Sequence, residues 1–337
     1  MAHFSPSNLV KAQLMVNDRY KAPENRYKQT PVLQLGLQYA TTLIPDAAAM
    51  RTREDRSVSA YLLARAKRTA GSTRTHNHSG NRGDSIEQAL TWGIYSDVFS
   101  ISLKQMDNNL FGFEMALSQQ LENAMKNIVE KAETTILTAL IAAKTQVNIA
   151  TKNGTFNATN DAFEITGQDR FYQYLKSMMS QNYYTGEIDV IADPIAYANA
   201  EYQSAQGAGN ATNSGFQFNG MNIVLSNELA DATYVGADVV LAMQRGSFGL
   251  IPWIPKQNRE GFGDYNSYVG GFGVINDPWG LGLTFAVHGY SNRADTSASN
   301  GNAQDVLMEF EVSLDLASAV APLSTATETP IFEAVKV

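Results

Sequence analysis

The sequence predicts an α+β fold organised around one very long amphipathic helix. Apolar residues recur at steps of three or four from residue 110 to 147, which is the spacing of one helix face. Two later stretches, 281–287 and 306–314, alternate apolar residues with others and predict a pair of strands. The region between these parts, 163–290, mixes short helix and strand signals. Together these observations indicate separate helical, stranded and mixed parts in one chain.

The composition is that of an ordinary folded protein. With 337 residues, 44% of them apolar, the chain can bury a substantial core. The longest apolar run, 136–143, is too short to cross a bilayer, and residues 1–16 lack the pattern of a signal peptide. The absence of cysteine excludes disulfides, cysteine zinc sites and thiol nucleophiles. A net charge of −8 argues against a protein whose main role is to bind DNA.

The first 45 residues contain four of the ten prolines and little periodicity. Such a segment cannot build a core of its own. We therefore expect an irregular, extended arm that gains order by lying on another surface.

Residues 46–103 predict a long projecting loop with a strand that returns from it. The segment 51–82 contains eight lysines and arginines but only two acids, Glu54 and Asp55. Residues 58–64 carry enough apolar surface for a short ordered element, 71–83 is rich in turn residues, and 92–103 resembles a strand. Single-strand nucleic-acid binders interleave aromatic and basic residues, and only Tyr61 does so here. We favour contact with carboxylates of neighbouring subunits, with nucleic acid as the alternative. The candidate contact residues are Arg53, Arg56, Arg65, Arg68 and Arg74.

The long helix should have one buried and one polar face. About forty residues at roughly 1.5 Å each give a rod of about 60 Å, capped from residues 107–109. A membrane span is excluded by a polar face that includes Glu122, Lys126 and Glu133. The predicted buried face consists of Leu121, Met125, Ile128, Ile136 and Leu140.

Several shorter elements follow. We expect a helix over 171–181, a strand over 187–192, and a helix over 195–206 that Asp193 caps and Pro194 opens. A hairpin turns at Asn219-Gly220, and 259–273 is a glycine- and tyrosine-rich loop. The tail after residue 321 is expected to be peripheral.

No catalytic motif emerges. The phosphate-loop motif is absent, the glycines at 261–263 and 270–273 do not continue as a dinucleotide fingerprint, and 246–249 is too short for a nucleophile elbow. His76, His78 and Asp84 could be imagined as a metal site, but a polar loop tip is the favoured reading because no third ligand has a recognised spacing. The tripeptide 82–84 (RGD) is a chance match to an adhesion motif. An aromatic cluster is expected in core or interface rather than around a ligand; its members are Phe248, Trp253, Phe262, Tyr265, Tyr268 and Phe272.

The order of parts resembles the Hong Kong 97-type fold of tailed-bacteriophage major capsid proteins. Four local stretches are also similar to that family: 75–85 (THNHSGNRGDS), 103–109 (LKQMDNN), 188–194 (IDVIADP) and 246–253 (GSFGLIPW). In the family's terms, the resemblance implies an N-terminal arm, an E-loop with flanking strands, a spine helix with P-domain, a mostly A-domain region, and a final P-domain strand with tail. The corresponding ranges are 1–45, 46–103, 104–162, 163–290 and 291–337.

The resemblance implies a structural subunit, not an enzyme, that assembles as hexamers and pentamers into an icosahedral head in the bacterial host cytoplasm and resides in the virion capsid. It implies no cofactor, no metal and no membrane. The implied partners are portal, scaffolding and decoration proteins, with double-stranded DNA enclosed without sequence-specific binding. The lysine–asparagine crosslink of some members does not map onto this sequence. The alternatives are an encapsulin-type nanocompartment shell and an α/β enzyme with an unrecognised site.

Overall fold

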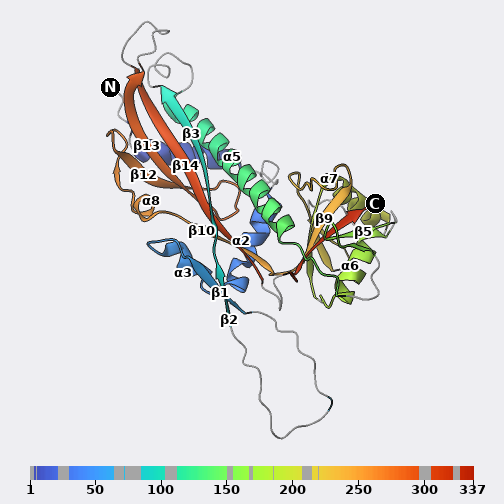
Figure 1. Cartoon of the computed structure of the whole chain (residues 1–337). Helices are drawn as coiled ribbons and strands as arrows, with labels where there is room; N and C mark the ends of the chain where they lie inside the picture. The colour runs from blue at the N-terminus through green and yellow to red at the C-terminus, as the bar shows by residue number, and fades with distance from the viewer. Residues whose placement is uncertain are drawn as a thin grey trace, which may run out of the picture.

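A computed structural model of the chain has the predicted α+β class. It describes residues 4, 6–21, 30–63, 72, 85–102, 112–149, 155–166, 170–184, 186–206, 215–218, 220–295, 305–321 and 327–337. Figure 1 shows one long helix, α5, lying along a sheet of long strands, a second sheet at one end, and a two-stranded ribbon below them. These parts correspond in order to those expected from the sequence.

The long helix α5 (Phe113–Ala142) has the predicted buried face. Its 30 residues span about 45 Å at the usual helical rise. All five predicted core residues are at most 4% exposed. The helix is shorter than predicted, because Gly112 lies at its N-cap and the chain turns away after Ala143. Beyond that turn the backbone N–H of Thr145 bonds to the carbonyl of Ile331, so the chain joins the second sheet instead of continuing the helix.

The prediction of an irregular N-terminal arm is wrong for the described residues. They form two helices, α1 (Pro6–Arg19) and α2 (Pro31–Leu43), and a third, α3 (Ala47–Thr52), follows at the start of the next predicted range. Pro6 and Pro31 open the first two helices, where a missing N–H costs nothing, so these prolines begin helices and do not break them. The expectation that the segment lies on another surface is confirmed within the same chain, since α1 packs on α5 and α2 packs against α5 and the first sheet.

Within the described residues the first sheet has six strands, of which β14 pairs with three others, β10, β13 and β3. The strand order is β10 (Phe248–Trp253), β14 (Asp305–Val320), β13 (Thr284–Asp295), β12 (Gly270–Asn276) and β11 (Gly263–Asp264). The sixth strand, β3 (Trp92–Ser102), pairs along β14 and also packs against α5. The predicted pairing of the two late strands is confirmed, as β13 and β14 are antiparallel neighbours.

The ribbon consists of β1 (Ser59–Leu63) and β2 (Ser85–Ala89), paired antiparallel. Except for Ser72, the residues that connect the two strands, 64–84, lie outside the described residues. The base of the ribbon lies beside a short helix, α8 (Lys256–Glu260), which joins the first sheet.

The second sheet has seven strands in the described residues, and one of them, β15, is far from the others in sequence. Its order is β4 (Phe156–Asn157), β5 (Ala162–Ile165), β15 (Ile331–Lys336), β9 (Asp238–Gln244), β6 (Ile188–Ala192), β8 (Met221–Leu225) and β7 (Gly215–Phe218). Two helices, α6 (Phe171–Gln181) and α7 (Pro194–Gln206), share a hydrophobic core with one face of this sheet. The predicted cap is confirmed, because Asp193 accepts the backbone N–H of Ala196 at 2.6 Å.

The prediction of a peripheral tail is wrong. Strand β15 lies between β5 and β9, and its first five residues are buried. The strand carries Ile331, Phe332, Ala334 and Val335 into the core, each at most 1% exposed. Local sequence signals do not reveal this strand, because polar residues precede the short apolar run and its neighbours in the sheet come from far earlier in the sequence.

Candidate assembly surfaces

Arg56, one of the five predicted contact arginines, is engaged within its own chain. Its guanidinium lies 2.7 Å from the Asp315 carboxylate on β14 and stacks over the Trp253 ring at 5.2 Å. Burial raises the pKa of Asp315, and the nearby Arg56 only partly offsets that effect. Arg56 therefore neutralises the charge of the buried Asp315 carboxylate. The pair lies where the segment that leads to the ribbon crosses the first sheet.

Arg53 also belongs to this crossing. Its side chain donates to the Ser57 hydroxyl, and its backbone carbonyl accepts hydrogen bonds from the Trp253 indole and from Arg259. Lys256 on α8 pairs with Glu54 at 2.7 Å, although both side chains are at least half exposed and the pair adds little stability. The base of the ribbon is thus braced by several polar contacts to β10 and α8.

The other predicted contact residues, Arg65, Arg68 and Arg74, lie outside the described residues, as do His76, His78 and Asp84. The role of the arginines between subunits stays a prediction. In the described part of the chain, no group of three or more histidine, cysteine, aspartate or glutamate residues is placed to hold a metal ion. Among the described helices, none has the length and hydropathy needed to span a bilayer.

The predicted aromatic cluster is divided between core and surface. Phe248, Trp253 and Tyr265 are buried, whereas Phe262 and Tyr268 are exposed. Phe272 stacks on His288 with a centroid distance of 4.5 Å. The expectation of core positions is therefore confirmed for Phe248, Trp253 and Tyr265, and an interface role for the exposed residues stays a prediction.

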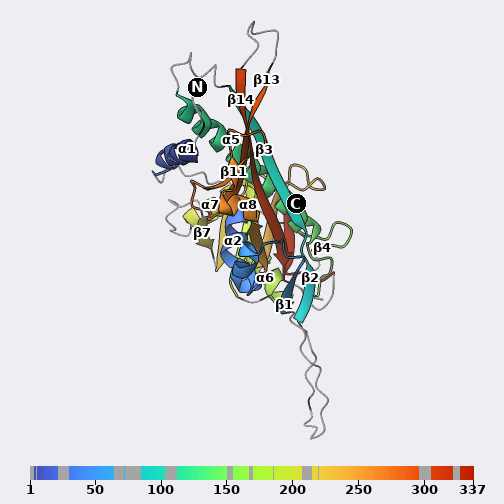
Figure 2. The same ribbon diagram turned by 90° about the vertical axis from the view of Figure 1, so that its left-hand side faces the viewer.

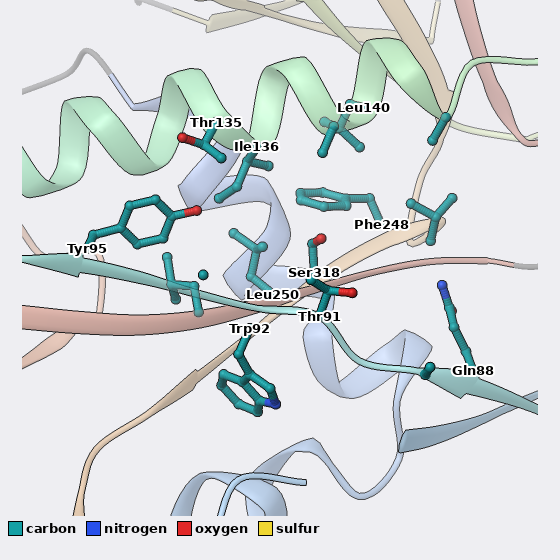
Figure 3. Close-up of a pocket in the computed structure, with 16 residues that line it drawn as sticks. Gln88, Thr91, Trp92, Tyr95, Thr135, Ile136, Leu140, Phe248, Leu250 and Ser318 are labelled. Atoms are coloured by element: carbon teal, nitrogen blue, oxygen red, sulfur yellow. The ribbon is translucent and has the colours of Figure 1, made fainter. Parts of the chain in front are cut away.

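A groove of about 370 Å³ lies between α5 and the strands β2, β3, β10 and β14 (Figure 3). Most of its lining is aliphatic or aromatic, as with Ile136, Leu140 and Phe248. Its polar side chains are hydroxyls and one amide: Gln88, Thr91, Tyr95, Thr135 and Ser318. Burial raises the pKa of Tyr95, so its hydroxyl stays protonated at neutral pH. The lining contains no carboxylate, histidine, lysine or arginine that could move a proton at neutral pH.

Buried acids join the separate parts of the molecule, and sequence reasoning missed them. Glu133, placed on the polar face of the long helix by its charge, is 0% exposed and accepts the backbone N–H groups of Val32 and Leu33 at 3.0 Å each. Glu333 on β15 is also fully buried and contacts the Lys144 ammonium, which lies 3.5 Å from Asp231. Mainly because of burial, the pKa of Glu333 is raised to about 7. The one sequence signal for Glu133 was its position on the helix, four residues after Val129 and three before Ile136, which places it on the buried face.

The N-terminal segment is held by an aromatic anchor and an amide clamp. The Phe4 ring, 3% exposed, makes edge contacts with Phe113, Tyr265 and Phe310. The Asn266 side chain accepts the Phe4 N–H at 3.0 Å and donates to its carbonyl at 2.6 Å. This pairing fixes the backbone just before α1, which then lies on α5.

No protein-family model matches the chain, and no curated protein matches its sequence. Several solved structures are similar in backbone arrangement. The capsid of a native GTA particle is 7% identical over 84% of this chain and 86% of that one, with a TM-score of 0.48. The capsid of the cyanophage P-SCSP1u is 17% identical over 85% of each chain, with a TM-score of 0.44. The holo-SrpI encapsulin complex from Synechococcus elongatus PCC 7942 is 13% identical over 75% and 76%, with a TM-score of 0.44.

Proposed function

We propose that this chain is the major capsid protein of a tailed bacteriophage, a shell-building subunit of the Hong Kong 97-type fold. The observation that carries the proposal is the order of parts along one chain. An N-terminal segment is followed by a projecting ribbon, a helix of 30 residues on a sheet of long strands, and a separate seven-stranded sheet. That order supports the resemblance stated from the sequence, although the N-terminal segment is helical and the C-terminal strand β15 lies inside the second sheet.

The charge distribution supports a role in self-association. The stretch 51–82 concentrates eight basic residues in a chain whose net charge is −8. Self-repulsion makes such a concentration slightly unfavourable in an isolated subunit. The arrangement becomes favourable when the ribbon lies against an acidic neighbour, where Arg65, Arg68 and Arg74 can pair with carboxylates. Arg53 and Arg56 brace the base of the ribbon and so hold it in position for that contact.

The finer assignments belong to the same proposal. The subunit forms hexamers and pentamers that close into an icosahedral head in the bacterial cytoplasm, and the head encloses double-stranded DNA without reading its sequence. Portal, scaffolding and decoration proteins are its expected partners, and the subunit is not an enzyme. The five sequence ranges remain part of the proposal, with the difference that β10, β11 and β12 of the fourth range lie in the first sheet and β15 of the last range lies in the second.

An encapsulin-type shell is the second candidate, because it requires the same self-association and the same projecting ribbon. The two candidates differ in what the shell encloses: a capsid encloses nucleic acid, whereas an encapsulin-type shell encloses a cargo enzyme. Electron microscopy and sedimentation of the purified full chain test the shared claim. Closed shells, or hexamers and pentamers, are expected. A monomer that persists at high concentration in every buffer would overturn the proposal, and shells that retain a cargo enzyme would favour the second candidate.

A further inference from the structure

Three ionisable side chains meet where the end of α5 reaches the second sheet. Lys144 follows the last turn of α5, Asp231 lies in the connection between β8 and β9, and Glu333 is the third residue of β15. The Lys144 ammonium contacts the Glu333 carboxylate and lies 3.5 Å from Asp231 Oδ2. Figure 1 shows the second sheet beyond this end of α5, and in Figure 2 the second sheet lies behind the first. The three groups therefore stand at the junction between the two sheets.

Little water reaches this cluster. The side chains of Lys144, Asp231 and Glu333 are 13%, 7% and 0% exposed. Charges are costly to bury, so such an environment favours the neutral forms of an amine and a carboxyl. Glu333 and Asp231 share a hydrogen bond, which two carboxyl groups form only when one of them holds a proton. Burial and then the neighbouring Asp231 raise the pKa of Glu333 to about 7, so Glu333 is the acid that holds this proton.

Backbone contacts fix the lysine in this position. The Thr329 hydroxyl donates to the carbonyl of Ala143 at 2.6 Å. The Thr145 N–H donates to the carbonyl of Ile331 at 2.8 Å. These bonds hold the chain on both sides of Lys144 against the start of β15, the strand that carries the buried acid. The amine does not have to search for its neighbours, which is the condition under which intramolecular reactions become fast.

The Asp231 carboxylate has two differently placed oxygens. Its Oδ1 accepts the backbone N–H of Thr233 at 2.7 Å, whereas Oδ2 faces Lys144. A backbone N–H at this distance stabilises the negative charge that develops on a carbonyl oxygen when a nucleophile adds to its carbon. One oxygen is thus held by the backbone, and the other lies beside both the amine and the acid.

We propose that Lys144 and Asp231 condense into an isopeptide bond within the chain, with Glu333 as the acid and base. Glu333 passes its proton to Asp231 Oδ2 and takes one from the Lys144 ammonium in exchange. The neutral amine then adds to Asp231 Cγ, which forms the C–N bond. A second amine proton passes through Glu333 to Oδ2, the Cγ–Oδ2 bond breaks, and this oxygen leaves as water. No oxidant or other reactant is needed, because one ammonium and one carboxylate become one amide and one water.

The bond joins the end of α5 to the loop before β9, between residues 87 positions apart in the sequence. It restricts the unfolded chain as a disulfide does, in a protein that has no cysteine. Because all three groups belong to one chain, the bond forms in an isolated subunit. The inference is therefore independent of the proposed shell function.

The mass of the purified full-length chain tests the proposal. After incubation at neutral pH, the denatured wild type is expected to be lighter than its sequence by the mass of one water. A tryptic digest should contain a branched peptide that joins residues 144 and 231. A dehydrated aspartate gives the same change in mass without a branch, so the branched peptide decides. A wild type of full mass, or one without this branched peptide, overturns the proposal.

Matched variants assign the roles. Lys144→Arg keeps the positive charge but supplies no neutral amine, so the chain should keep its full mass. Glu333→Gln removes the acid at similar volume and should slow bond formation by about a hundredfold or more, as followed by mass during cell-free synthesis. The control is Lys336→Arg, which alters a lysine–aspartate pair of 3.3 Å on the same sheet and should still lose the water.

The variants also provide the contrary outcomes. A Glu333→Gln chain that forms the bond at the wild-type rate overturns the role of Glu333. If that variant does not fold, Lys144→Arg is compared with the control, and equal masses overturn the proposal.

Discussion

Glu133 on α5 holds Leu33, 100 residues earlier in the chain, through a hydrogen bond of 3.0 Å to its backbone nitrogen. The other carboxylate oxygen holds the N–H of Val32 in the same way. These two donors belong to the first turn of α2, which has no side-chain cap of its own. A side chain of the long helix therefore caps a helix of the N-terminal segment.

Removal of this cap should destabilise the subunit. Glu133→Ala leaves two buried N–H groups without partners, a cost of about 1–3 kcal/mol for each unsatisfied group. Glu133→Gln retains one acceptor and should cost less. Urea unfolding followed by circular dichroism measures the difference, with Gln120→Ala on the exposed side of α5 as the control. Equal midpoints for Glu133→Ala and the control would contradict the capping role.

Stability should also fall as the pH rises through the neutral range. Burial outweighs the two backbone hydrogen bonds and raises the pKa of Glu133 to about 8, and that of Glu333 to about 7. Each acid binds its proton more tightly folded than unfolded, so the free energy of unfolding is highest near pH 5 and decreases toward pH 8. The slope is at most about 1.4 kcal/mol per pH unit for each group. Unfolding of wild type and Glu133→Gln across this range should show a flatter profile for the variant; parallel profiles would exclude Glu133 as a source.

The buried face of α5 should not tolerate a charge. Ile128→Asp places an unpaired carboxylate in the core, at a cost on the order of 3 kcal/mol or more. We expect the variant to accumulate in inclusion bodies. Asn123→Asp, on the exposed side of the same helix, should remain soluble. A soluble Ile128→Asp protein with wild-type melting would show that this face is not buried in solution.

The arginines of the basic stretch should separate into two classes. Arg56→Ala leaves the buried Asp315 unpaired and should cost the subunit about 1–2 kcal/mol, because Arg56 is still partly solvated. Arg65→Glu with Arg68→Glu should leave subunit melting unchanged and block shell formation, and high salt should weaken wild-type assembly. Calorimetry and sedimentation distinguish the classes. If the double variant assembles normally but loses nucleic acid, these arginines face the genome.

Local signals in the sequence were sufficient for elements that depend on neighbouring residues. The Asp193 cap, the turn at Gly220, which has a φ of 78°, and the helical spacing that buries Ile128 and Leu140 each depend on residues within a single turn or a single helix. All three predictions are confirmed.

Long-range partners could not be read from the sequence. Glu133 looks like any charged residue on a solvated face until α2 lies against it. Pro31 suggests an interruption of helical structure when only the sequence is considered, but in the structure it is the first residue of α2, a helix with a buried face. The run that forms β15 is recognisable as a core strand only in the folded structure, where it lies between β5 and β9. The interface residues are harder still, because their partners are on another copy.

The place of β15 also determines the order in which the molecule can fold. Met243 near the end of β9 is the cross-strand partner of Ile331 at the start of β15, so the two strands form a hairpin whose connection is the whole of residues 245–330. Five of the six strands of the first sheet, β14 included, thus lie inside this one connection of the second sheet. A ribosome makes β9 long before its partner, and closure of so long a loop is slow. The seven-stranded sheet therefore stays incomplete while the strands of the other sheet are synthesised. A nascent chain cannot present a finished subunit surface to its neighbours until both sheets are complete.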